Sequence, residues 1–396
     1  MEKKEKSIMG LTTSSHFLVH LFEGVLPPLI PLVMLEFNAD YFHIGLIVSI
    51  FSYAFGLFAI PAGIISDRIY PKHLITIFLL CAGIPAIAVF KATSILGYGI
   101  LMGIIGIFAA IYHPAANTLI ARSIKKKGKG FGLHGIAGSL GVASAPAISA
   151  FIGTAAGWRT PHIIYGAIGI AIAVFSFTMK KDNTESGTDI EPDKTEEKKK
   201  KSYYPLILFF LTAIFLGLTY KGIMTFLPIY MGENVHFNFI KSNKIALGGF
   251  VTTLALLAGA VGQYVSGKLT DKYPPEKIYF FTVLCGAVCV FSIAFTTNFA
   301  LILSAMFYAF FYFSVQPIQN YIISVYLPVH RHGIGYGILF MMTFGVGSTA
   351  ALISGYMADK FGLASIFYLM GVCYTIAAFI AYLLYKTSKN PRSEVA

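Results

Sequence analysis

The chain has 396 residues, of which 56% are hydrophobic and only 12% are charged. Ordinary soluble domains have about 25% charged residues, so this composition excludes a soluble globular protein and indicates a membrane protein. The formal net charge of +12 does not indicate nucleic-acid binding, because the basic residues lie in short clusters between apolar stretches.

Twelve apolar stretches are predicted to cross the membrane as helices, since each is long enough to span a hydrocarbon layer of about 30 Å. In chain order they cover residues 11–36, 43–66, 74–91, 95–122, 130–154, 158–179, 203–231, 244–268, 278–297, 299–327, 333–357 and 363–386. The first follows "MEKKEK" and lacks a small-residue cleavage site, so we expect a retained helix rather than a signal peptide.

The basic clusters predict the orientation of the chain. They occupy alternating loops, including "RSIKKKGK" at 122–129, as well as both ends of the chain. The positive-inside rule therefore places these loops and both termini in the cytoplasm, with anionic lipid head groups as contacts. We expect a multi-pass protein of the cell membrane, and a monomer.

Residues 180–202 separate the sixth and seventh apolar stretches and contain more charged than uncharged side chains. Such a segment cannot bury a core, so we expect a disordered cytoplasmic linker. It divides the chain into two predicted six-helix bundles, at 1–179 and 203–396.

The two predicted bundles repeat a pattern. Asp67-Arg68 and Asp271-Lys272 both follow the second helix of their bundle, and "HPAAN" at 113–117 recurs as "QPIQN" at 316–320. Internal repeats of this kind are typical of secondary transporters.

The loop "GIISDRIYPK" matches the signature Gly-x-x-x-Asp-Arg-x-Gly-Arg-Lys at Gly63, Asp67, Arg68 and Lys72. The whole chain resembles the major facilitator superfamily in this loop and in its duplicated organisation. The resemblance implies an all-α fold of twelve transmembrane helices and transport by alternating access. "DRIYP", "DKYPP", "YHP" and His16 look most similar to the fosmidomycin-resistance group of efflux proteins.

The resemblance also implies a conformational latch. When the transporter faces outward, Asp67 is expected to cap the helix that begins with "GIGYG", and Asp271 the helix that begins with "GFG". A carboxylate is stabilised near a helix N-terminus by about 0.3–1 kcal/mol. Arg68, Lys72 and Lys272 belong to the same two loops. The alternative is that these charges only mark the inner face.

The predicted fifth helix carries a face of small residues, which allows helices to approach closely. Its members are Gly135, Gly138, Gly141 and Pro146. This face resembles the Gly-Pro signature of antiporters, although Ala145 stands where that signature usually has Gly. Close packing alone is the alternative explanation.

Ionisable side chains inside a membrane are costly, so each is a candidate for function. The candidates within the predicted helices are His16, His20, Glu23, His113, His134 and Lys221. His20 and Glu23 share a helix face. Glu23 and Lys221 lie on the equivalent first helices of the two bundles, so we expect them to meet across a central cavity and to exchange a proton for a substrate.

Structural roles are the alternative for the histidines. His16 is expected near the cytoplasmic interface with a structural hydrogen bond, His134 near a helix start in a capping contact, and His113 beside the kink made by Pro114. Four amide side chains, Asn117, Gln316, Gln319 and Asn320, are further candidates for lining the cavity.

These features together predict a proton-coupled secondary transporter, an exporter working by antiport on a small anionic or amphipathic organic compound, with Lys221 as the buried cation. The alternative is transport of a metal ion or metal chelate by His20, Glu23, His113 and His134, since imidazole and carboxylate suit Fe, Zn or Ni. No phosphate-binding loop, Gly-x-Ser-x-Gly or His-Glu-x-x-His motif occurs, so neither an enzyme nor a cofactor is expected.

Overall fold

The computed structural model describes residues 2–179, 203–236, 243–327 and 332–388. Every regular element in these ranges is helical, and twelve helical segments are long and apolar enough to cross a membrane. The predicted all-α fold with twelve spans is therefore confirmed. The predicted linker at 180–202 lies outside the described residues.

The first six spans form one group of helices. They are α1 (Lys3–Gly24) with the turn Pro27–Leu29 and α2 (Ile30–Phe37); α3 (Tyr41–Arg68); α4 (Pro71–Ala88) with Val89–Lys91; α5 (Ile95–Ala109) with α6 (Tyr112–Ser123); α7 (Lys127–Ala156); and α8 (Arg159–Thr178). We refer to α1–α8 as the N-terminal bundle.

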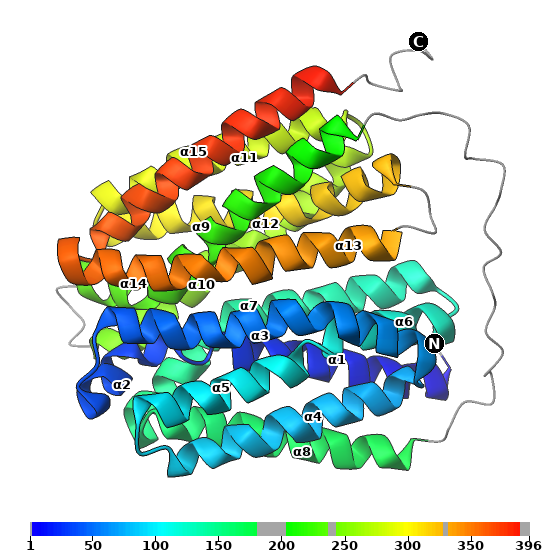
Figure 1. Ribbon diagram of the computed structural model, residues 1–396, viewed down its shortest axis with the longest axis horizontal. Coiled ribbons are helices and arrows are strands. Elements are labelled where there is room, and N and C mark those ends of the chain that lie inside the picture. Colours follow the sequence, from blue (N-terminus) through cyan, green and yellow to red (C-terminus); the bar gives the residue numbers. More distant parts are fainter. Residues whose placement is uncertain (1, 180–202, 237–242, 328–331, 389–396) are drawn as a thin grey trace.

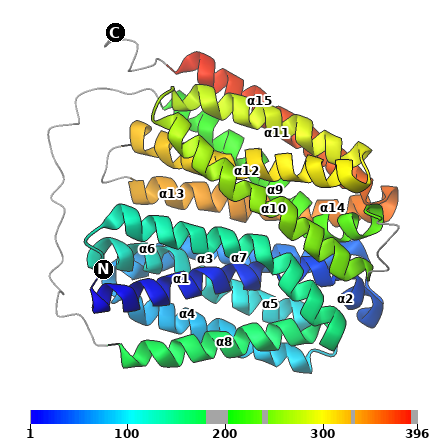
Figure 2. The same cartoon turned by 180° about the vertical axis from the view of Figure 1, so that it is seen from behind.

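The last six spans form the second group. They are α9 (Tyr204–Asn234), α10 (Lys244–Thr270), α11 (Pro275–Phe295), α12 (Asn298–Tyr326), the span made of α13 (His332–Phe340), Met341–Ser348 and α14 (Thr349–Phe361), and α15 (Ala364–Thr387). We refer to α9–α15 as the C-terminal bundle. The two bundles lie one against the other, with α7 beside α10 and α3 beside α14 (Figure 1, Figure 2).

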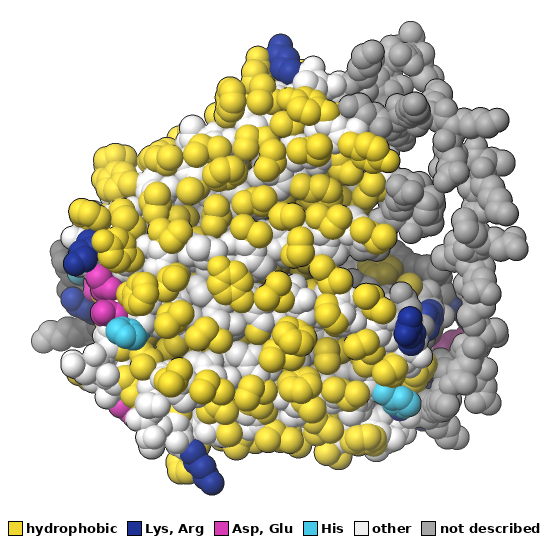
Figure 3. All heavy atoms as spheres, in the orientation of Figure 1, with side chains coloured by type: hydrophobic (Ala, Val, Ile, Leu, Met, Phe, Trp, Pro, Cys, Tyr) yellow, Lys and Arg dark blue, Asp and Glu magenta, His cyan; other side chains and the backbone are white. Residues whose placement is uncertain are grey.

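Both described ends of the chain lie at the same end of the molecule, which we call the terminal end (Figure 1). Charged side chains gather at the terminal end and at the opposite end, and on the face that Figure 3 shows, apolar side chains form a belt between them. Leu57, Phe175 and Phe177 are examples of exposed apolar side chains, at 58%, 52% and 68%. Such a belt is solvated by lipid, so the chain is a multi-pass membrane protein.

Three spans are irregular near their middles. Pro27 and Pro28 follow the end of α1, where they cannot donate the hydrogen bonds that would continue the helix. Pro114 lacks the N–H that would bond to Ala110, and α5 ends just there, at Ala109. In the eleventh span a π-helical turn, Met341–Gly345, interrupts the α-helix. π-helical turns frequently mark functional sites.

The bundles are closed against each other at the opposite end. Both carboxylate oxygens of Asp359 at the end of α14 accept hydrogen bonds from the start of α3, from Tyr41 N at 3.1 Å and Phe42 N at 2.9 Å. Farther along α3, Ser49 Oγ donates to Ser348 O at 2.7 Å. Gly56 lies so close to Gly345 that a Cβ on Gly56 would come within 2.6 Å of the Gly345 nitrogen.

Toward the terminal end the same helices diverge. A Cβ placed on Gly63 of α3, Gly132 of α7, Gly267 of α10 or Gly337 of α13 would meet no atom of a neighbouring helix within 4 Å. The structure is therefore closed at the opposite end and open toward the terminal end. If the predicted orientation is right, this conformation faces the cytoplasm.

Candidate functional site

Glu23 and Lys221 form an ion pair between the two bundles. Lys221 Nζ, on α9, lies 2.5 Å from Glu23 Oε1 on α1, and the two side chains are only 6% and 15% exposed. The expected meeting of these residues is thus present in the structure. Because water is largely excluded, the attraction between the charges is much stronger than on a protein surface.

The partners of the pair come from both bundles. Glu23 Oε2 accepts a hydrogen bond from His20 Nδ1 at 3.1 Å, so both carboxylate oxygens are engaged. Lys221 Nζ lies 5.1 Å from the ring centre of Phe344, in the π-helical turn, and 5.6 Å from that of Tyr220. Aromatic faces at this distance attract a cation. The irregular part of the eleventh span therefore helps to hold the lysine.

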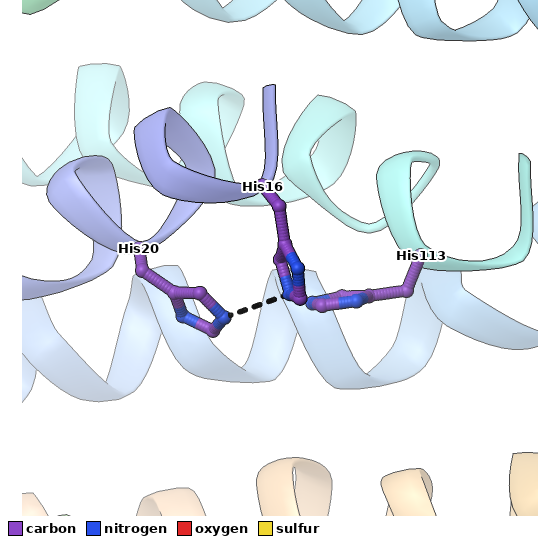
Figure 4. A group of neighbouring side chains, drawn as sticks. All are labelled: His16, His20 and His113. Atoms are coloured by element: carbon purple, nitrogen blue, oxygen red, sulfur yellow. Dashed lines mark hydrogen bonds between the residues drawn. The ribbon is translucent and has the colours of Figure 1, made fainter. Parts of the chain in front are cut away.

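Four histidines cluster beside the pair, three of them shown in Figure 4. His16 Nε2 lies 3.3 Å from His20 Nε2, and the His16 ring stacks on that of His134 with centres 4.0 Å apart. The His113 ring centre is 5.1 Å from that of His16 and 5.7 Å from that of His20. The cluster joins α1, α6 and α7 within the N-terminal bundle.

The structure bears on two expectations for these histidines. The position of His16 near the membrane interface stays a prediction, and its ring is buried beside those of His20, His113 and His134. Its predicted structural hydrogen bond does exist, from Nδ1 to the carbonyl oxygen of His134 at 2.7 Å. His134 is not at a helix start, because α7 begins at Lys127, and its ring is buried against His16.

His113 lies where the bundles face one another. Its ring centre is 6.0 Å from that of Phe55 on α3 and 5.6 Å from that of Phe340 on α13. The break before Pro114 explains why the helix turns at this point. His113 therefore contacts both bundles as well as the other histidines.

The ion pair faces a small pocket of about 40 Å³. It is lined by His20, Glu23, Gly24, Pro27, Val48, Val142, Pro146, Tyr220, Lys221, Met224, Thr225 and Thr252. Pockets that bind drug-sized ligands measure about 300–1,000 Å³, so this space is much smaller than such a pocket. A larger pocket of about 460 Å³ lies at the opposite end, lined among others by Glu233 and Lys244, away from the histidine cluster.

The small face of the fifth span packs mainly within its own bundle. Gly138 lies against the His16 ring, and Gly141 lies against the backbone of Phe17 and the Cβ of His20. Gly135 has open space beside it. Pro146 lines the central pocket. The glycines thus make room for α1, which favours the close-packing explanation of this face.

The amide candidates divide into three kinds. Gln316 Oε1 accepts from Gln263 Nε2 at 2.8 Å, and Gln263 Oε1 accepts from Ser139 Oγ at 2.9 Å, which links α12 and α10 to α7 of the other bundle. Gln319 instead donates to Tyr279 OH at 3.1 Å inside the C-terminal bundle, so its expected place in the cavity is wrong. Asn117 and Asn320 are exposed and do not line the pocket.

The predicted latch residues lie at the terminal end. Lys72 does not reach the other bundle, because its Nζ donates to the last carbonyls of α8, Ser176 O at 3.2 Å and Met179 O at 2.7 Å. Arg68, Asp271 and Lys272 are exposed, and the side chain of Asp67 lies outside the part of the chain that the structure describes. A latch between Asp67 or Asp271 and the facing bundle stays a prediction for the other conformation.

Asp359 is the functional candidate that sequence reasoning missed. It caps a helix of the facing bundle, as was expected of Asp67, but at the opposite end of the molecule. The only signal was an isolated acid and base, "DK", at the end of the eleventh stretch. Gln263 was also missed, since it lies singly in an apolar stretch.

Known proteins resemble the chain over nearly its whole length. The profile of the Major Facilitator Superfamily matches residues 12–351 and 210–396. An uncharacterized MFS-type transporter of Methanocaldococcus jannaschii is 25% identical over 97% of this chain and 99% of its own. The D-galactonate transporter of Escherichia coli O6:H1 is 24% identical over 83% of each chain.

Among solved structures, a bacterial homolog of the human lysosomal transporter Spinster, in an inward-facing and occupied conformation, matches 98% of both chains with a TM-score of 0.80 and 15% identity. At this identity the likeness shows the fold alone. The profile match covers most of the chain and agrees with the twelve spans. The chain belongs to the major facilitator superfamily and is a secondary transporter, not an enzyme.

Proposed function

We propose that the chain is a proton-coupled transporter of a small organic anion, with Lys221 as the cation that binds the anion and Glu23 as the group that takes up the proton. The observation that carries the proposal is the 2.5 Å ion pair in the middle of the contact between the bundles. The name of the D-galactonate transporter, whose substrate is a carboxylate, supports an anionic substrate here.

The pair implies a rule for coupling. In the structure Lys221 is bound to Glu23, so a substrate anion can bind Lys221 only if the carboxylate withdraws. An unpaired buried carboxylate costs several kcal/mol, and protonation of Glu23 removes this cost. The anion and a proton therefore bind together.

The same rule predicts the net charge that crosses the membrane with each substrate molecule. The Glu23–Lys221 pair is neutral when empty, and it is neutral again when a monoanion on Lys221 accompanies a protonated Glu23. Only neutral forms then pass through the closed intermediate at low cost. A monoanion should therefore cross the membrane without net charge movement.

Export by proton antiport, which the sequence led us to expect, differs from this scheme in one measurable way. In antiport the proton and the anion cross the membrane in opposite directions. When the anion displaces the Glu23 carboxylate from Lys221, the proton and the anion cross in the same direction. The direction in the cell then depends on the gradients. The similarity to fosmidomycin-resistance proteins, the cytoplasmic termini and the monomeric state stay predictions.

Counterflow in proteoliposomes tests the substrate class. The full chain is reconstituted, and exchange is measured for labelled D-galactonate, a short dicarboxylate, a sulfonate, a sugar phosphate and an uncharged nucleoside. We expect exchange of at least one anion, and loss of that exchange in Lys221→Ala but not in a variant of the exposed Lys91, Lys91→Ala. Exchange of the nucleoside alone, or anion exchange that survives Lys221→Ala, would contradict the proposal.

A further inference from the structure

We propose that His16, His20 and His113 form a binding site for a divalent transition-metal ion of the Zn²⁺ type, which the proposed anion transport does not require. One ring nitrogen of each residue lies within 4.8 Å of those of the other two (Figure 4). Imidazole is a preferred ligand of Zn²⁺, and three histidines with an open fourth position form a common zinc site.

The hydrogen bond of His16 sets its tautomer. Its Nδ1 lies 2.7 Å from the carbonyl oxygen of His134, and a carbonyl oxygen only accepts hydrogen bonds. Nδ1 therefore carries the hydrogen. In the neutral ring the lone pair is then on Nε2, which faces the cluster.

A hydrogen bond to a carboxylate sets the tautomer of His20 in the same way. Its Nδ1 lies 3.1 Å from Glu23 Oε2, and Glu23 is ionised in its pair with Lys221, so His20 donates to it. Metal-binding histidines are commonly oriented by a carboxylate that accepts from the ring nitrogen away from the metal. The lone pair of neutral His20 is likewise on Nε2.

The two Nε2 atoms face each other at 3.3 Å. Two lone pairs at this distance repel, so the arrangement calls for a cation between them. Zn–N bonds of about 2.0–2.1 Å in a tetrahedral site place two ligand nitrogens about 3.3 Å apart. The distance between His16 and His20 thus fits one edge of a tetrahedral metal site.

A shared proton is the other cation that fits between two imidazoles. The position of His113 favours a metal ion over a shared proton. A proton joins only two nitrogens, whereas the third ring lies beside both others. All three nitrogens lie within 4.8 Å of one another, which is at most about 1.5 Å beyond the tetrahedral edge, and a change in the side-chain torsions of His113 can close such a gap. Glu23 neutralises Lys221, so the neighbouring pair does not repel an incoming ion.

Zinc binding to the purified full chain tests the site. The protein is treated with a chelator, and Zn²⁺ binding is followed by calorimetry, with Co²⁺ absorption as a check for tetrahedral nitrogen ligation. We expect one ion per chain in the wild type and in His43→Ala, which alters an exposed histidine at the opposite end. His113→Ala and His16→Gln should bind at least tenfold more weakly.

Two further variants keep the result interpretable. His113→Cys replaces one ligand with a thiolate and should restore binding, which a loss of folding would not allow. Lys221→Met should bind Zn²⁺ at least as tightly as the wild type, even though we expect it to lose transport, so the two proposals can fail separately. Absence of a saturable Zn²⁺ site in the wild type, which leaves a shared proton only, or a site that survives both His113→Ala and His16→Gln, would overturn the proposal.

Discussion

Lys221 Nζ and Glu23 Oε1, from the first helices of the two bundles, lie 2.5 Å apart with little exposure to water. Removing one partner of such a buried pair costs about 3–5 kcal/mol, because the other charge is left uncompensated. We therefore expect Glu23→Gln and Lys221→Met each to lower the free energy of unfolding by about this amount in the purified protein.

The double variant Glu23→Gln/Lys221→Met distinguishes stability from function. It removes both charges, so most of the lost stability should return, while transport should remain absent. Chemical unfolding in detergent and counterflow in proteoliposomes measure the two effects. A double variant as unstable as the sum of the single variants would show that the pair is not coupled in the folded protein.

Asp359 is expected to hold the opposite end closed, because its carboxylate accepts from Tyr41 N and Phe42 N across the bundles. Loss of a capping carboxylate costs about 0.5–2 kcal/mol, which corresponds to an approximately 2- to 30-fold shift in a two-state equilibrium. Asp359→Ala should therefore increase the fraction of molecules open at the opposite end. Asp359→Asn, which keeps one acceptor oxygen, should have a smaller effect.

A cysteine at Ser49 reports this opening. Ser49 is 1% exposed between the bundles, and the substitution is conservative. The reporter is placed in a chain whose four native cysteines are replaced by serine. Alkylation should be faster with Asp359→Ala than without it, and an unchanged rate would rule out the latch.

Gly56 and Gly63 offer a matched pair on α3. A Cβ on Gly56 would approach the backbone nitrogen of Gly345 to 2.6 Å, and a backbone cannot rotate away, whereas a Cβ on Gly63 meets nothing within 4 Å. Gly56→Ala should therefore separate the bundles at a cost of about 1–3 kcal/mol. The Ser49→Cys reporter should react faster in Gly56→Ala, and equal rates in the two alanine variants would contradict the observed contact.

Replacing Lys72 tests whether this residue stabilises its own bundle and is not part of the predicted latch. Its ammonium donates to the carbonyls that end α8, and hydrogen bonds from charged groups contribute about 1.5–3 kcal/mol. Lys72→Met should lower the stability of the N-terminal bundle without changing alkylation of the Ser49→Cys reporter. A faster reaction would instead place Lys72 in the control of conformation.

The twelve spans could be predicted because a membrane demands about 20 apolar residues per helix, which is a local property of sequence. The start of the first helix could not be predicted by that criterion. α1 extends through polar residues outside the hydrocarbon, where Glu5 accepts from the backbone N of Glu2 in a capping box.

Contacts between distant helices were harder to predict. Glu23 and Lys221 could be paired because the internal repeat relates their helices. The different contacts of Gln316 and Gln319 could not be predicted, because the sequence does not show which face of α12 meets the other bundle. The contact between Asp359 and the start of α3 belongs to a conformation closed at the opposite end. The sequence alone does not indicate which conformation the structure adopts.

Proton movement driven by an anion gradient tests the central claim most directly. Proteoliposomes carrying a pH-sensitive dye inside are given an inward gradient of the anion that supports counterflow. If anion and proton bind together at Lys221 and Glu23, the interior should acidify as the anion enters, and Glu23→Gln should abolish the acidification. Alkalinisation of the interior, or anion entry with no pH change in the wild type, would contradict the account.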